Sequence, residues 1–489
     1  MIYRNKILIV LLLILLSACN PIEQTNDTDG NINAITLNTF INQPSLKNAS
    51  IGILAVDLNS GETVLEHNSS ISLVPASTLK ILTSAAALET FGPDHRFKTT
   101  LAYTGNISEG RTLNGNIILQ GGGDPTFLSP RFEKHYKNAI KNMVQEIQNS
   151  GIRWINGNVV GDGSYFGLPQ IPDTWIWEDM GNYYGSPAFA LNVFDNTYSL
   201  TFKTGSAGSL SSITNTNPEL PQLKFENRVT AADNKQDNAY IYGSYLSNKR
   251  VIKGTIPENR KSFSIKGSIP DPAKIAAHQL FVKLKEKGIG ISGEARSNYD
   301  ESKQAKFQPL LEINSPPLSE IIEQLNMKSI NLYAETMLLH LSKKTKEKCS
   351  VEAGCESLKT FWGNAGMDVS GLYLEDGSGL SRANAITPEQ LVFVLQHMHQ
   401  SKNDKSFKQS LPIAGKSGTL KSFGKNTILE GKLKAKSGYM SRAMSYTGYL
   451  TTESGEELAF AVMVNNYNCS NSEMRKILEE LLVSLANNP

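Results

Sequence analysis

The sequence has few cysteines, almost no excess charge and no long apolar run beyond its N-terminus. It contains 4 cysteines in 489 residues and shows no CxxC pair, HExxH spacing or histidine cluster, so we expect neither a disulfide-dense scaffold nor a metal or other cofactor. Its 48 basic and 46 acidic side chains leave a net charge of +2, which offers no basic surface to a nucleic acid. The length and the 40% of apolar residues suffice for the cores of several globular domains. Composition excludes several classes of protein but does not define an activity.

The N-terminus is typical of an export signal. Two basic residues precede an apolar stretch at 7–16, which is too short to span a hydrocarbon core of about 30 Å. The stretch ends in Leu16-Ser17-Ala18-Cys19, which resembles the bacterial lipobox, where cleavage leaves the cysteine as a lipid-modified N-terminus. In the alternative, an ordinary secretory signal, Cys19 is incidental. We expect a lipoprotein signal peptide at 1–19, a flexible polar tether at 20–35, and a globular part that is exported to the periplasm and anchored to a membrane by lipid.

Hydrophobic periodicity divides the remaining chain into three stretches. The first, 36–92, predicts a β-hairpin and then a helix that opens at Pro75-Ala76-Ser77. Short β-like runs between Gly, Pro and Asn clusters fill 93–304, and 305–489 holds three helical patterns, three strands and a last helix. The main expected elements are strands at 51–58, 62–66, 432–436, 444–450 and 458–465, and helices at 78–90, 132–150, 318–342, 351–365, 388–400 and 472–486.

This order of elements predicts the fold class. A hairpin near one end of the chain and three strands near the other suit one antiparallel sheet flanked by helices on both faces, an α/β (α+β) fold. The stretches 36–92 and 305–489 would form this core together, and 93–304 would be inserted between them as one or more mostly β domains.

Three cysteines follow the N-terminal signal. Cys349 and Cys355 lie close together with Gly354 between them, whereas Cys469 stands alone. In an oxidising envelope the first two could form a small local disulfide, and the alternative is three unpaired thiols.

Ser77 and Lys80 are the first candidates for chemistry. They stand three apart at the predicted helix start, so both side chains share one face and can meet. The helix start also favours negative charge that develops beside Ser77. A serine becomes a nucleophile only when a base takes its proton, and a lysine can be that base only if burial or nearby cations lower its pKa. An SxxK spacing alone is common by chance, and Lys80 could be a solvated helix residue.

Two further groups strengthen this hypothesis. Ser329-Ile330-Asn331 lies within a predicted helix, and Lys436-Ser437-Gly438 ends a predicted strand. Ser329 can relay a proton, Asn331 can donate to a substrate amide, and Lys436 with Ser437 can bind a carboxylate. Gly438 would let a strand-like ligand approach the backbone, and the amides of Ser77 and Tyr439 would form an oxyanion hole. An SxxK, SxN and KTG set is the signature of penicillin-binding proteins and class A β-lactamases.

A second Lys-Ser-Gly occurs at 416–418 and competes for the third role. It follows Pro412 and is surrounded by Gly, Ser and Lys, which is typical of a loop. Lys436 instead ends an extended run that leads into the strand at 444–450. We therefore assign the third motif to Lys436.

The chain resembles the class C low-molecular-mass penicillin-binding proteins, which are D-alanyl-D-alanine carboxypeptidases and endopeptidases. The resemblance covers essentially the whole globular chain, and this family inserts extra domains between Lys80 and Ser329, where the interval is long. Ser437 replaces the usual threonine but keeps the hydroxyl, and Ile330 in the middle of SxN should point away from the ligand. No ExxLN-like run supplies the deacylating glutamate of a class A β-lactamase. The remaining shared segments are Gly121-Gly122-Gly123-Asp124-Pro125, Asp376-Gly377-Ser378-Gly379-Leu380-Ser381-Arg382 and Gly418-Thr419-Leu420.

The resemblance implies a serine D,D-peptidase with a β-lactamase-like, penicillin-binding core. Its substrate would be a peptidoglycan stem peptide ending in D-Ala-D-Ala, or a cross-bridge in which D-Ala is joined to diaminopimelate. Ser77 would attack with Lys80 as base, Ser329 and Lys436 would pass the proton to the leaving amine, and β-lactams would acylate the same serine.

Family members also recognise the far amine of the stem peptide with an acidic residue of the insertion. Glu178 and Asp179, between two tryptophans and two tyrosines, are the candidates here, although an ordinary surface loop explains them equally well. For Asp124 and Asp376, in Gly-rich turns, we expect a structural role. The alternatives to a D,D-peptidase are a serine β-lactamase or esterase on the same fold, and a lipid-anchored protein that binds β-lactam or peptidoglycan without hydrolysis.

Overall fold

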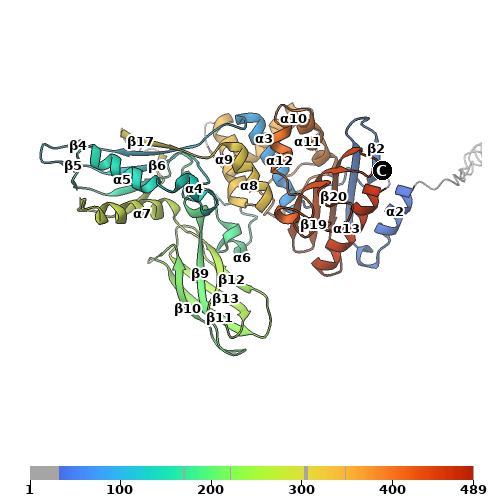
Figure 1. Cartoon of the computed structure of the whole chain (residues 1–489), viewed down its shortest axis with the longest axis horizontal. Helices are drawn as coiled ribbons and strands as arrows, with labels where there is room; N and C mark the ends of the chain where they lie inside the picture. Colours follow the sequence, from blue (N-terminus) through green and yellow to red (C-terminus); the bar gives the residue numbers. More distant parts are fainter. Residues whose placement is uncertain (1–31, 169–170, 221, 302–306, 347–348, 488–489) are drawn as a thin grey trace, which may run out of the picture.

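The computed structural model describes residues 32–168, 171–220, 222–301, 307–346 and 349–487. The predicted signal peptide and Cys19 lie outside the described residues. The molecule is elongated, with one part built from both ends of the chain and the insertion extending away from it as two lobes (Figure 1). The predicted tether reaches into a helix, because α2 spans Ile32–Ile41.

A five-stranded antiparallel sheet forms the centre of the first part. Its order is β18-β19-β20-β1-β2, so β1 from the start of the chain pairs with β20 from its end. This confirms the predicted sheet. The strands are β1 Ser50–Asp57, β2 Thr63–His67, β18 Leu433–Met440, β19 Ala443–Thr451 and β20 Glu457–Asn465.

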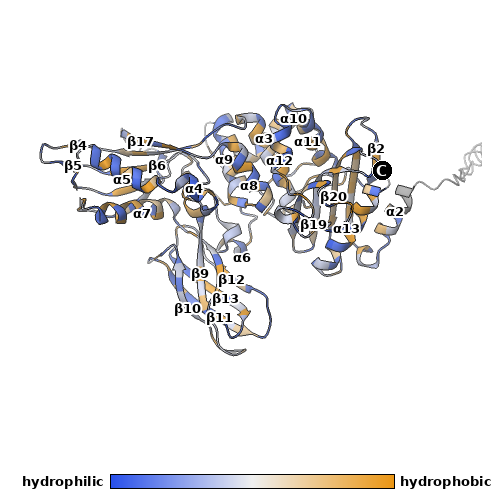
Figure 2. Ribbon diagram, in the orientation of Figure 1, coloured by the Kyte–Doolittle hydropathy of each residue, from blue (hydrophilic) through white to orange (hydrophobic). Residues whose placement is uncertain are grey.

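The sheet is apolar on both faces because strand side chains alternate between two cores. Leu54 and Val56 of β1 pack with the helices between the sheet and the insertion, whereas Ile53 and Ala55 pack with α2 and α13. Figure 2 shows hydrophobic residues concentrated on these central strands. Helices therefore cover both faces, as predicted. The helices are α3 Lys80–Phe91, α8 Leu318–Lys328, α9 Asn331–Thr345, α10 Val351–Asn364, α11 Pro388–Gln400, α12 Asp404–Ser410 and α13 Asn471–Asn487.

The lobe of the insertion that contains α5 and α7 mixes strands with helices. A five-stranded sheet, β16-β8-β6-β3-β17, and a four-stranded sheet, β15-β7-β5-β4, pack with α5 and α7. We did not predict α7, and the pattern at 132–150 contains two separate helices. The elements are β3 Lys98–Tyr103, β4 Asn106–Ile107, β5 Thr112–Asn114, β6 Ile117–Gly121, α4 Glu133–Tyr136, α5 Ala139–Asn149, β7 Trp154–Ile155, β8 Val159–Asp162, α7 Pro272–Glu286, β15 Gly290–Ile291, β16 Ala295–Asn298 and β17 Gln308–Asn314.

The second lobe is built from two three-stranded sheets, β10-β9-β14 and β11-β13-β12. The short helix α6, Trp177–Met180, lies where this lobe approaches α8 and α9 (Figure 1). The strands are β9 Thr197–Lys203, β10 Ser212–Asn217, β11 Lys224–Ala232, β12 Asn238–Tyr242, β13 Lys249–Pro257 and β14 Phe263–Ser268.

The insertion begins and ends on neighbouring strands. Lys98 at the start of β3 pairs with Asn314 at the end of β17, in antiparallel register. We expected the insertion to end at 304, but this pairing places β17 in the same sheet as β3, so the inserted sheet continues to Asn314. Strand pairing between distant segments is not visible in local periodicity.

Two further observations concern the described residues as a whole. Cys349, Cys355 and Cys469 are unpaired, and the first two are buried. Among these residues no helix is both long enough and apolar enough to cross a membrane, and no group of three His, Cys, Asp or Glu side chains is arranged to hold a metal ion.

Candidate active site

Ser77 lies in a 3₁₀ turn, Ala76–Leu79, that leads directly into α3. Ala76 adopts a left-handed conformation with φ 48°, which is uncommon for a residue with a side chain. Ser445 of β19 holds the turn, because its hydroxyl donates to the Pro75 carbonyl at 2.6 Å and lies 3.1 Å from the Thr78 hydroxyl. The turn is therefore fastened to the central sheet on the side of Thr78, while Ser77 points toward Lys80.

Lys80 is fully buried and makes three hydrogen bonds through Nζ. The partners are Ser77 Oγ at 2.9 Å, Asn331 Oδ1 at 2.6 Å and the Ser378 carbonyl at 2.7 Å. Burial lowers the pKa of Lys80 to about 7, although the carboxylates of Asp376 and Glu335 oppose the shift. An amine with this pKa can accept a proton near neutral pH.

The Ser-Ile-Asn motif occupies a break between two helices and not the interior of one. Ser329 ends α8 with a left-handed φ of 56°, and Ile330 is extended, so α9 begins at Asn331. The prediction of one helix over 318–342 was therefore wrong at this point. The break turns Ser329 and Asn331 toward the two lysines, while Ile330 packs against the hydrophobic core.

The third motif lies inside β18, whereas we placed it at the end of a strand. Lys436 Nζ donates to Ser329 Oγ at 2.9 Å, and Ser437 Oγ donates to Thr419 Oγ1 at 2.8 Å. Burial, followed by the positive charge of Lys80, lowers the pKa of Lys436 well below its usual value. These contacts connect β18 to the helix break, so the three motifs form one group.

The competing Lys416 lies elsewhere. Its segment is a loop as predicted, and its side chain passes over Gly431. The loop nevertheless reaches the site through Thr419, which contacts Ser437.

Gly438 has a structural role that the sequence did not reveal. A Cβ at this position would lie 2.5 Å from the Pro75 carbonyl oxygen and 2.9 Å from the Thr78 nitrogen. The missing side chain lets β18 pack directly on the turn that carries Ser77. Tyr439 follows on the same strand; its ring is 55% exposed and its hydroxyl accepts a hydrogen bond from Asn471.

Asp376 organises the turn whose Ser378 carbonyl contacts Lys80. Its carboxylate accepts hydrogen bonds from the Gly379 and Ser381 amides, at 2.7 and 2.6 Å, and from the Trp175 indole at 2.8 Å. Asp124 is also buried and accepts from Thr126 and Tyr136. Both carboxylates therefore satisfy donors in their turns, which agrees with the structural role expected for them.

The insertion contacts the site through the segment that follows α6. The Tyr184 carbonyl accepts a hydrogen bond from Asn331 Nδ2 at 2.8 Å. Asp179 is half-buried close to Tyr184 and Arg382; burial raises its pKa, and Arg382 and the Tyr184 hydroxyl oppose the shift. Glu178, its neighbour on α6, acts electrostatically on Tyr184 as well. The structure therefore brings both acidic residues near Tyr184, whose carbonyl contacts Asn331, and Asp179 also forms a hydrogen bond with the Tyr184 hydroxyl.

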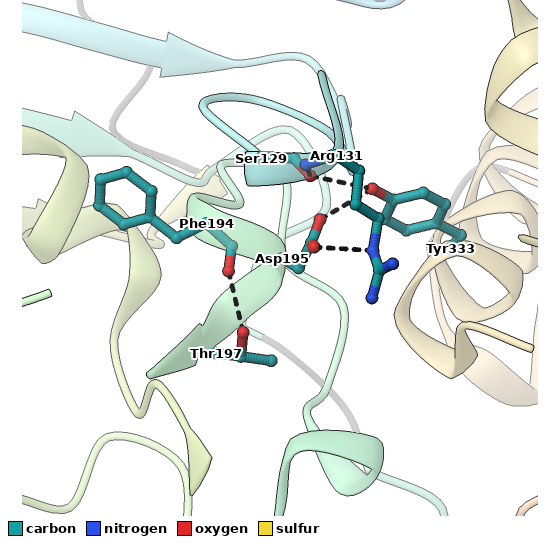
Figure 3. Close-up of polar contacts among 6 residues, drawn as sticks. All are labelled: Ser129, Arg131, Phe194, Asp195, Thr197 and Tyr333. Atoms are coloured by element: carbon teal, nitrogen blue, oxygen red, sulfur yellow. Dashed lines mark hydrogen bonds and ion pairs between the residues drawn. The ribbon is translucent and has the colours of Figure 1, made fainter. Parts of the chain in front are cut away.

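A second contact joins the insertion to α9. Figure 3 shows Asp195 between Arg131 and Tyr333. Tyr333 donates to Asp195 Oδ1 at 2.7 Å, and Arg131 Nε donates to Asp195 Oδ2 at 3.0 Å. Tyr333 is two residues after Asn331, so the insertion is attached to the helix that carries the second motif.

Several residues at the site were missed by sequence reasoning. Tyr184 and Ser378 contact the site through backbone carbonyls, and Ser445 through a single hydroxyl; a sequence pattern does not predict such contacts. Glu335 could have been found from the sequence, because it is an acidic residue one helical turn after Asn331 in an otherwise mostly apolar run.

The site places a serine next to a buried lysine, with a second lysine and the helix break that carries Asn331 close by. This arrangement lies on an antiparallel sheet flanked by helices. Together these features define a serine enzyme with the penicillin-binding fold. The model of the D-Ala-D-Ala carboxypeptidase 3 (S13) family matches residues 33–488, and the chain belongs to that family. It is therefore a serine-type carboxypeptidase, as the resemblance implied.

Individual relatives agree with this assignment. The chain is 28% identical over 443 residues to the D-alanyl-D-alanine carboxypeptidase of Actinomadura sp. (strain R39), which covers 88% of this chain and 80% of that protein. The crystal structure of penicillin-binding protein 4 (DacB) from Haemophilus influenzae aligns with a TM-score of 0.75 and 26% identity, covering 90% of this chain and 96% of that one. The complex of that protein with a β-lactam aligns with a TM-score of 0.72 at 24% identity, over 90% of this chain and 97% of the other.

Proposed function

We propose that the chain cleaves peptidoglycan stem peptides through an acyl-enzyme on Ser77. The observation that supports this most strongly is the contact of Lys80 Nζ with both Ser77 Oγ and Asn331 Oδ1. A buried amine with a pKa of about 7 is partly uncharged at neutral pH, and the uncharged amine can accept the Ser77 proton. The hydroxyl is thereby activated without a histidine.

Acylation of Ser77 requires one proton to leave its hydroxyl and one proton to reach the leaving amine. Ser77 Oγ bonds to the penultimate D-Ala carbonyl carbon as its proton moves to Lys80, and the amides of Ser77 and Tyr439 stabilise the oxyanion. When the C–N bond breaks, the leaving amine must gain a proton. The proton taken up by Lys80 balances this step when it passes to the leaving amine, and Ser329, which accepts a hydrogen bond from Lys436, is placed to relay it. Water then attacks the ester and releases the peptide and free Ser77.

The remaining groups orient the substrate. Lys436 and Ser437 would bind the terminal carboxylate, Asn331 would donate to the peptide, and Asp179 would attract the far amine of the stem peptide, with Glu178 beside it on α6. β-Lactams mimic the acyl donor, and we propose that they acylate Ser77 and inhibit the enzyme.

We also propose that Cys19 is lipid-modified and that the enzyme works in the periplasm from a membrane surface. The support is the lipobox-like end of the N-terminal apolar stretch. Cells fed labelled palmitate should label the wild type and not Cys19→Ser; equal labelling of both would contradict the anchor.

The activity is tested on a diaminopimelate-containing muropeptide. Wild type should release D-alanine, or separate cross-linked muropeptides, and Ser77→Ala should lose this activity while remaining folded by circular dichroism. If wild type is as inert as Ser77→Ala, the proposed reaction is wrong. Rapid turnover of penicillin in place of a long-lived acyl-enzyme would point instead to a β-lactamase.

A further inference from the structure

A buried carboxyl group next to the site is not used by the mechanism above. Glu335 lies on α9, one helical turn after Asn331, and is 4% exposed. Its Oε2 accepts a hydrogen bond from the Gly377 amide at 3.1 Å, its buried Oε1 has no close hydrogen-bond donor, and the nearby Ser378 hydroxyl also favours the charged form of the carboxyl group. Burial of a carboxylate with few hydrogen-bond partners costs free energy. Holding a proton or lying near a cation lowers that cost for Glu335.

Glu335 reaches Lys80 through the turn at Gly377. The Gly377 amide donates to Glu335, and the next carbonyl, that of Ser378, accepts a hydrogen bond from Lys80 Nζ at 2.7 Å. The Gly377 carbonyl in turn accepts from Thr83 on α3, at 2.7 Å. The side chain of Glu335 thus fixes one end of the short turn that contacts the ammonium group.

Three other segments place titratable groups around this pair. Asp376 of the turn acts electrostatically on both Glu335 and Lys80, Glu335 acts on Cys355 of α10, and Lys80 acts on Lys436 of β18. Burial and the negative charge of Asp376 raise the pKa of Glu335, and its own charge raises the pKa of Lys80. Protonation of the acid and of the amine is therefore linked.

We propose that Glu335 is a positioning residue for Lys80, which holds the Gly377–Ser378 turn against the amine and acts on it electrostatically inside the core. This inference rests on the proposed role of Lys80 as the base. Because the charges of Lys80 and Glu335 act on each other, the acid side of the pH profile of acylation depends on both groups and should be broader than a single titration.

The sign of the effect of Glu335 follows from its charge. An ionised Glu335 stabilises the ammonium form of Lys80, which cannot accept the Ser77 proton. In Glu335→Gln the amide oxygen still accepts from Gly377, but the charge is gone. Lys80 then loses its proton at lower pH, so we expect the acid limb to move down by up to about one pH unit and to follow one titration.

The experiment measures the rate of acylation by a fluorescent penicillin from acid to alkaline pH for wild type, Glu335→Gln and Glu352→Gln. Glu352 is an exposed carboxylate on the neighbouring helix α10, where solvent screens its charge, so its variant should keep the wild-type profile. Suppose that Glu335→Gln lowers the acylation rate at every pH and yet keeps the midpoint and breadth of the wild-type profile. That result would show a merely structural role for Glu335 and overturn the proposal.

Two outcomes keep this inference separate from the proposed function. If the wild type is not acylated at all, the assignment of Ser77 and Lys80 fails. If it is acylated and Glu335→Gln titrates like the wild type, only the role of Glu335 fails. Should Glu335→Gln not fold, Glu335→Met fills the same space without a charge, and its acid limb should also move to lower pH; an unmoved limb contradicts the proposal.

Discussion

At the residue scale, the two buried lysines differ in the partners that surround them. Lys80 contacts a hydroxyl, an amide oxygen and a carbonyl. Two nearby carboxylates partly oppose the lowering of its pKa by burial. Lys436 contacts Ser329 and its neighbour's carbonyl, and in the described part of the chain it has no ion pair. Burial lowers the pKa of this amine, and a carboxylate that arrives with the substrate would stabilise its charged form.

The two Lys-Ser-Gly sequences allow a matched test of this role. Lys436→Ala should slow acylation by a fluorescent penicillin about 10²-fold, because a hydrogen bond to a charged group contributes roughly 2–3 kcal/mol. Lys416→Ala should leave the rate unchanged, since Lys416 lies over Gly431. An equal effect of both changes, or a larger effect at Lys416, would show that the carboxylate binds elsewhere.

At the scale of elements, the position of Ser77, the proposed nucleophile, depends on the close packing of β18 against the Ala76–Leu79 turn. The two segments meet at Gly438, where no side chain separates strand and turn. Ser445 holds the same turn from β19. The position of Ser77 is thus set by the sheet as well as by its own helix.

Gly438→Ala tests this packing. The new Cβ would meet backbone atoms that cannot move without shifting Ser77, so we expect acylation to fall by about 10²-fold while the fold persists. The control is Gly363→Ala in α10, where a Cβ would meet only Val369 at 3.8 Å. Stopped-flow acylation and circular dichroism measure both; an active Gly438→Ala would contradict the packing argument.

Some strands and helices could be predicted from the sequence, whereas the break between α8 and α9 could not. Nearly continuous apolar runs predicted β1 and β20 closely because both faces of these strands are buried in cores. The break at Ser329 could not be predicted, since the apolar periodicity of α8 continues into α9. Its left-handed conformation is set by tertiary contacts, among them the hydrogen bond from Lys436.

At the scale of the whole molecule, the insertion is attached to the site at several points. Tyr184 contacts Asn331, Trp175 contacts Asp376, and Asp195 contacts Tyr333. The short β-like runs over 93–304 predicted that an insertion exists, and the family resemblance agreed with it. Neither could predict these contacts, which depend on how the lobes fold back onto α9.

Asp195→Ala tests the attachment. It leaves the buried Tyr333 hydroxyl and the partly buried Arg131 without their carboxylate, so we expect a loss of about 2 kcal/mol in the free energy of unfolding. Glu312→Ala, which breaks an exposed pair with Lys98, should cost less than about 1 kcal/mol. Denaturant unfolding measures both, and equal losses would show that the Asp195 contact does not stabilise the junction.

The pairing of Lys98 with Asn314 has a consequence for how this architecture can vary. Both ends of the insertion leave the core side by side. The separation of the two points of attachment on the core is therefore short, whatever the length of the insertion. Segments can therefore be gained, lost or exchanged beyond β3 and β17 without stretching the chain between α3 and α8. The limit on such exchange is chemical, because any replacement must still offer a backbone carbonyl to Asn331.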